Sequence, residues 1–163
     1  MYAMRKFLIL FVGALLWWSG ASGQSKGFME LYMQAREALK RGAEGITTAE
    51  MSGKMLRELV PSKAKEDFHV VNRIDRIRQM KFAPVAEKDL FAKVEAMAAD
   101  TTVYEQMSLI NVDGQRVAVY KAPYGNLKSE YLILISKGSA ALVCDIVGNI
   151  SLKDIMGLLY GKQ

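Results

Sequence analysis

The sequence has only one cysteine, Cys144, and one histidine, His69. A single cysteine cannot form an internal disulfide, so the fold must be stabilised by packing alone. One cysteine and one histidine also nearly exclude a zinc site made from these ligands within the chain. The few residues that most often carry enzyme chemistry therefore have to be judged one by one.

Neither residue has the setting that catalysis requires. Cys144 shares one side of a predicted strand with Ile146, and its neighbour Asp145 would not lower the pKa of a thiol. His69 follows Asp67 at a spacing of two, which on a helix makes the two side chains diverge. We interpret both residues as structural.

Motifs for phosphate, dinucleotide or acyl chemistry are missing as well. No phosphate loop, Gly-x-Gly-x-x-Gly turn or Gly-x-Ser-x-Gly elbow occurs, and the carboxylates lack the spacing of a calcium loop. We predict no catalytic residue, no cofactor and no metal site. An enzyme built from scattered Asp, Glu, Ser and Tyr residues remains an alternative.

The N-terminus has the pattern of an export signal. Arg5 and Lys6 precede an uncharged, mostly apolar run over residues 7–18, and the small residues 19–23 follow. We expect cleavage between Gly23 and Gln24, which leaves residues 24–163 as one domain. A retained anchor is the alternative, but this run has 12 residues where about 20 are needed to cross a bilayer.

Export sets the expected location and partners. No cysteine follows the cleavage site, so a lipid anchor is not expected, and the protein should be a soluble periplasmic or extracellular protein. Loss of Arg5 and Lys6 leaves 20 basic against 17 acidic residues, a mild balance that demands no polyanionic partner. The absence of disulfides is more typical of a bacterial envelope than of a small eukaryotic secreted domain.

Periodicity predicts an α+β fold in which helices cover an antiparallel sheet. A four-strand C-terminal meander forms most of this sheet, and one or two N-terminal strands complete it. The predicted helices are 28–41, about 51–60, 63 to about 74, 87–98 and 151 onward. The predicted strands are 45–50, about 76–82, 104–112, 115–122, 129–137 and 140–147.

Two local signals are more specific. Asp113-Gly114 predicts a two-residue hairpin turn, in which paired residue numbers add up to 227 and Met107 faces Tyr120. Ser151 and Asp154 predict a capping box at the start of the last helix, with flanking apolar residues as a hydrophobic staple.

One stretch of the chain concentrates basic residues. Acidic residues dilute it, and a solvated charged face is the default interpretation. Contact with an anionic membrane or lipopolysaccharide surface is the functional alternative, whereas export argues against nucleic acid. The residues concerned are Lys63, Lys65, Arg73, Arg76, Arg78 and Lys81.

The segments 131–136 and 141–155 resemble the closing part of the domain of unknown function 4252 family, small exported proteins common in Bacteroidota. Residues 45–56 and 74–78 are similar to earlier segments of that family. The resemblance covers essentially the whole mature chain and implies no established activity or catalytic residues. Many members look like lipoproteins, and this chain departs from them because it lacks the anchor cysteine.

The sequence thus favours an exported envelope protein that acts as a non-enzymatic binding or interaction module. Its partner would be an envelope protein or a small ligand, bound through the sheet or a helical groove. The sequence does not indicate an oligomeric state.

Overall fold

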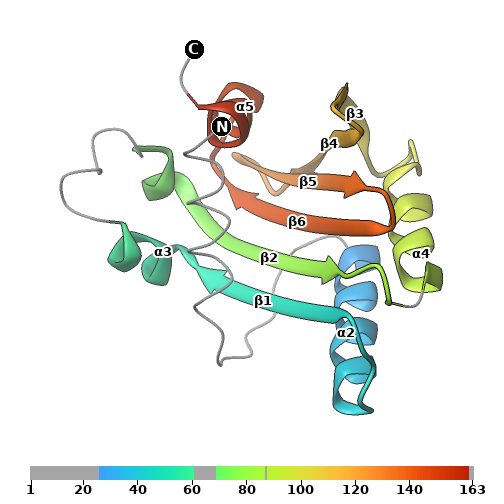
Figure 1. Cartoon of the computed structure of the whole chain (residues 1–163). Coiled ribbons are helices and arrows are strands. Elements are labelled where there is room, and N and C mark those ends of the chain that lie inside the picture. The colour runs from blue at the N-terminus through green and yellow to red at the C-terminus, as the bar shows by residue number, and fades with distance from the viewer. Residues whose placement is uncertain (1–25, 61–68, 87, 162–163) are drawn as a thin grey trace.

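The structure is a computed structural model that describes residues 26–60, 69–86 and 88–161. Helices and strands alternate in the N-terminal half, and four strands follow one another before the last helix (Figure 1). The elements are α2 (Lys26–Lys40), β1 (Ile46–Ser52), α3 (Gly53–Leu59), the 3₁₀-helix η2 (His69–Arg73), β2 (Ile74–Phe82), α4 (Lys88–Ala98), β3 (Glu105–Val112), β4 (Gln115–Tyr124), β5 (Lys128–Lys137), β6 (Ala140–Gly148) and α5 (Leu152–Tyr160).

The six strands form one antiparallel sheet in the order β1-β2-β6-β5-β4-β3. The four C-terminal strands are a meander, and β2 pairs with the last of them, β6. This arrangement confirms the predicted α+β class, with both N-terminal strands present. It also places β1 at one edge of the sheet and β3 at the other (Figure 1).

The predicted hairpin is present, with one correction to its register. Asp113 and Gly114 both have positive φ, as a two-residue turn of this kind requires. Pairs from Val112–Gln115 to Ser108–Val119 follow the predicted register. Beyond Ser108 a β-bulge shifts the register, so Gln106 lies opposite Tyr120, and the predicted Met107–Tyr120 pair is wrong.

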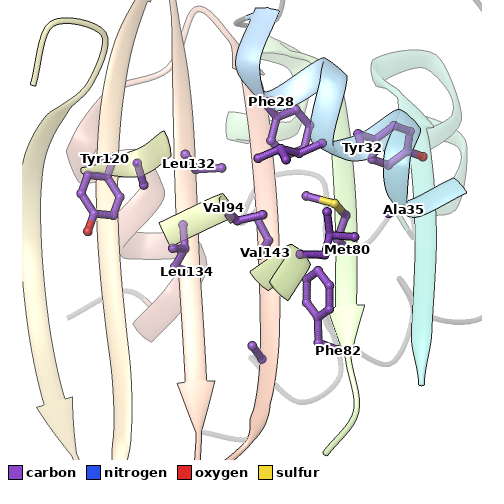
Figure 2. Packing of buried hydrophobic residues seen from close by; sticks show 14 of the residues in the cluster. Phe28, Tyr32, Ala35, Met80, Phe82, Val94, Tyr120, Leu132, Leu134 and Val143 are labelled. Atoms are coloured by element: carbon purple, nitrogen blue, oxygen red, sulfur yellow. The ribbon is translucent and has the colours of Figure 1, made fainter. Parts of the chain in front are cut away.

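Apolar layers cover both faces of the sheet. On one face, α2 and α4 pack against the strands, with Phe28 and Tyr32 above Met80 and Val143 (Figure 2). Val94 of α4 belongs to the same layer. On the other face α3, η2 and α5 contribute a second cluster; its members include Leu56, Val70, Val71, Ile77, Ile133, Ile146, Ile155 and Leu159.

Caps define where the second-face helices begin. Ser151 and Asp154 form the predicted capping box, because the Ser151 side chain accepts from the Asp154 N–H and the Asp154 side chain accepts from the Ser151 N–H. Ser52 caps α3 through its side chain, which accepts from the Met55 N–H. The sequence predicts Met51 in that helix, but the structure buries it at the end of β1.

The basic stretch was expected to be a helix to about residue 74 and then a strand. Residues 61–68 lie outside the described residues, as does the expected signal segment 1–23. The described remainder agrees with the prediction, since η2 leads directly into β2. Among the described helices, none is long and apolar enough to span a membrane.

Candidate functional site

Three charged side chains are buried on the sheet face that α2 and α4 cover. Arg78 lies on β2 directly opposite Asp145 on β6, and Glu130 on β5 is a diagonal neighbour of Asp145. Their exposed fractions are 2%, 0% and 1% for Arg78, Asp145 and Glu130. Burial of a charge is costly unless it is paired or neutralised, so each of these groups needs an account.

Arg78 is held mainly by residues outside this group of three. Its Nη2 lies 3.2 Å from the Glu50 carboxylate on β1, and its Nη1 donates to the Met29 sulfur of α2 at 2.7 Å. The guanidinium also lies over the Tyr32 ring, 5.6 Å from the centroid. Strand β1 and helix α2 therefore converge on this arginine.

The carboxyl groups of Glu130 and Asp145 have different hydrogen-bonding neighbours. The Tyr104 hydroxyl donates to Glu130 Oε1 at 3.0 Å. Among the described residues, Glu130 is the one hydrogen-bonding neighbour of the Asp145 carboxyl. Burial raises the pKa of Asp145 well above its ordinary value, the negative charge of Glu130 raises it further, and Arg78 opposes both effects.

A carboxyl group that retains its proton near a second carboxylate is an arrangement that acid–base enzymes use. Here both carboxyl groups are buried, so in this structure a substrate reaches neither of them. An enzyme built from scattered Asp, Glu, Ser and Tyr residues stays a prediction. The raised pKa of Asp145 means that this carboxyl pair can keep a proton bound inside the fold.

Of the two edge strands, β3 is the more exposed. Within the described residues nothing pairs with the outer side of β3. Leu109 and Val112 expose 43% and 53% of their surface there. At the opposite edge, by contrast, Ile46 and Met51 of β1 are buried.

Strand β3 also lacks most features that protect sheet edges from pairing. Charged residues, prolines and bulges are the usual protection. The β3 bulge lies near its start, around Met107, and Glu105 is its only charged residue. From Ser108 to Val112 the edge is regular, uncharged and without proline.

The structure disperses most of the predicted basic strip. Arg73 forms an ion pair with Asp154 at 2.7 Å, and Arg76 lies 3.5 Å from Glu50. Arg78 is the buried residue described above. Lys81 is exposed on β2, and Lys63 and Lys65 lie outside the described residues. Contact with an anionic surface therefore stays a prediction. Among the described residues of the predicted basic strip, Lys81 is the only exposed one.

His69 and Cys144, which the sequence predicts to be structural residues, lie on different elements of the fold. His69 is exposed at the start of η2. The Cys144 thiol accepts from Gln79 Nε2 at 3.8 Å and packs against the second-face cluster. Burial raises the pKa of this thiol to about 12, although the Gln79 hydrogen bond opposes the effect.

Reasoning from the sequence did not find the buried carboxyl pair. A signal was available, because Asp145 alternates with Val143 and Glu130 alternates with Leu132, so each occupies an inward position of an apolar strand. What the sequence could not supply is the strand order, which places β6 between β2 and β5.

The fold defines a class of protein, namely an antiparallel sheet covered by helices on both faces, with β1 and β3 as its edge strands. The sequence model for a domain of unknown function, DUF4252, matches residues 32–158. The chain belongs to this family. No curated protein and no solved structure matches the chain.

Proposed function

We propose that this protein is an exported, non-enzymatic interaction module that binds an extended protein segment along the free edge of β3. The observation that carries the proposal is the regular, uncharged edge from Ser108 to Val112, with Leu109 and Val112 exposed on it. Exposed edges of this kind bind additional strands through main-chain hydrogen bonds, and the flanking side chains provide selectivity.

Two arguments support the individual parts of this proposal. Export rests on the basic start, apolar run and small residues of the segment 1–23. The non-enzymatic part rests on the burial of Glu130 and Asp145, an acidic pair that a substrate does not reach in this structure.

Site-specific photo-crosslinking in producing cells tests the binding edge. A photoreactive amino acid at position 109 should give covalent adducts with a bound protein segment. The matched control is the same amino acid at Thr47, an exposed position on the other edge strand, β1. We expect adducts at position 109 and none at position 47; equal labelling of both edges, or none at 109, would refute the proposal.

Export has a separate test. Cell fractionation followed by intact-mass measurement should find the protein in the envelope or medium, with Gln24 as its first residue. An uncleaved chain in the cytoplasm would contradict export. It would not affect the proposed binding at the β3 edge, which the crosslinking experiment tests.

A further inference from the structure

We propose that the strand bound at the β3 edge is β3 of a second copy of this chain, paired antiparallel about a two-fold axis at Ile110. This inference rests on the proposed function and names the partner of that edge. It would join two six-stranded sheets into one continuous sheet.

The turn that closes the hairpin determines which backbone groups of β3 face outward. Val112 and Gln115 flank the two-residue turn and form its closing hydrogen-bonded pair. Opposite residues in antiparallel strands alternate between hydrogen-bonded and non-hydrogen-bonded pairs. The N–H and C=O groups of Ile110 therefore point toward β4, and those of Leu109 and Asn111 point to the open edge.

The bulge fixes the length of edge that is available. It interrupts the β3–β4 register between Gln106 and Ser108, while the turn begins after Val112. The regular segment therefore has Ile110 at its centre. A partner strand that uses the whole segment, and only this segment, must be centred on the same residue.

The two-fold pairing satisfies the outward backbone groups. An axis at Ile110 places Leu109 opposite the partner subunit's Asn111, and Asn111 opposite the partner subunit's Leu109. Each of these pairs can exchange both of its N–H···O bonds across the edge. A shift of the axis to Asn111 would require Asp113 of the turn to join the ladder, and a shift to Leu109 would bring the bulge into it.

Side chains also suit this pairing. Ile110 would meet its own symmetry mate on the sheet face that α5 covers, and Val112 would lie opposite the partner subunit's Ser108 on the same face. No charged residue lies between Ser108 and Val112, so self-pairing opposes no like charges. The other edge strand, β1, differs from β3 in this respect, because it carries the charged residue Glu50, which pairs with Arg76 and Arg78.

Single-cysteine crosslinking tests the register. In a Cys144→Ser background, Ile110→Cys would place the two introduced sulfur atoms on a non-hydrogen-bonded pair, whose Cα atoms lie roughly 4.5 Å apart. That separation is within disulfide range. Leu109→Cys is the matched control, because its symmetry mates would lie two residues out of register, roughly 8–9 Å apart, beyond that range.

The expected result is a disulfide-linked dimer for Ile110→Cys after mild oxidation, at least several-fold more abundant than for Leu109→Cys. Intact mass and non-reducing electrophoresis measure it. Stronger linkage at position 109 than at 110 would overturn the proposed axis. Equal linkage at both positions would show random collision and overturn it as well.

Sedimentation velocity tests the association itself on protein purified from cells that produce the full chain. We expect a dimer that Leu109→Lys converts to monomer, whereas Val85→Lys, which alters an exposed apolar residue away from the edge, should leave it unchanged. A monomer at all concentrations, combined with adducts to another protein at position 109, would overturn this inference and leave the proposed function standing. A monomer without adducts at position 109 would overturn both.

Discussion

Replacement of Asp145 by Asn tests the account of the buried carboxyl cluster. The side chain is fully buried, and its hydrogen-bonding neighbour is the Glu130 carboxyl. Asn has nearly the same shape and no titratable proton. The substitution therefore removes the titratable group while it leaves the packing of β6 against β2 and β5 in place.

The pH dependence of the effect follows from the raised pKa of Asp145, which burial causes first and the charge of Glu130 reinforces. The folded state retains a proton on Asp145 at pH values where the unfolded chain has released it. Its stability is therefore greatest below the unfolded pKa of about 4 and falls as the pH rises toward the folded pKa.

One proton corresponds to about 1.4 kcal/mol per pH unit within that window. The stability advantage of Asp145→Asn over the original protein should therefore grow by up to this amount for each unit above about pH 4–5, until Asp145 ionises in the folded state as well. At lower pH the two proteins should differ little, because both then bury a neutral polar group of nearly the same shape at this position.

Urea unfolding followed by far-ultraviolet circular dichroism, at one-unit steps from pH 4 to pH 8, measures this difference. Asp113→Asn is the control, because it removes a carboxylate from an exposed turn position that Asn also tolerates. A stability difference for Asp145→Asn that stays constant with pH, or that shrinks as the pH rises, would refute the reasoning.

Three further predictions concern the fold. Ser151→Ala removes the acceptor at the start of α5 and should lower the free energy of unfolding by about 1 kcal/mol in the same denaturation assay. Gly148→Ala would place a Cβ 2.2 Å from the Arg73 carbonyl oxygen and should cost about 1–3 kcal/mol, whereas Gly157→Ala, with open space around it in α5, should stabilise by about 0.5–1 kcal/mol. Alkylation of Cys144 by iodoacetamide at pH 8 should be far slower than that of a free thiol, since burial raises its pKa to about 12; a rate equal to that of an unfolded control would contradict this.

Local signals in the sequence predicted local structure well. The Asp113-Gly114 turn and the Ser151–Asp154 capping box depend on residues within four positions of one another, and both are present. The bulge before Ser108 escaped prediction because nothing in an alternating strand marks where an extra residue is inserted. The transition at Met51 was missed for a similar reason, since its apolar side chain suits a strand and a helix equally.

The candidate sites depend on contacts between distant residues. Arg78 was grouped with surface cations because its neighbours in sequence are basic, yet its partners Glu50 and Met29 come from other elements. Likewise, the free edge of β3 exists only because β2 pairs with β6 and leaves the end of the meander open. Pairing at such sequence separation is set by the whole fold, and the pattern of one strand does not reveal it.

The two apolar layers described above have a consequence for how this protein tolerates change. They are separated by the sheet, so substitutions in one layer should add to those in the other with little interaction. Strand β3 contributes no buried side chain to either layer, and its partly buried Met107 packs against the second one. The edge can therefore accumulate substitutions at small cost to folding, which leaves its choice of partner open to adaptation while the rest of the domain stays fixed.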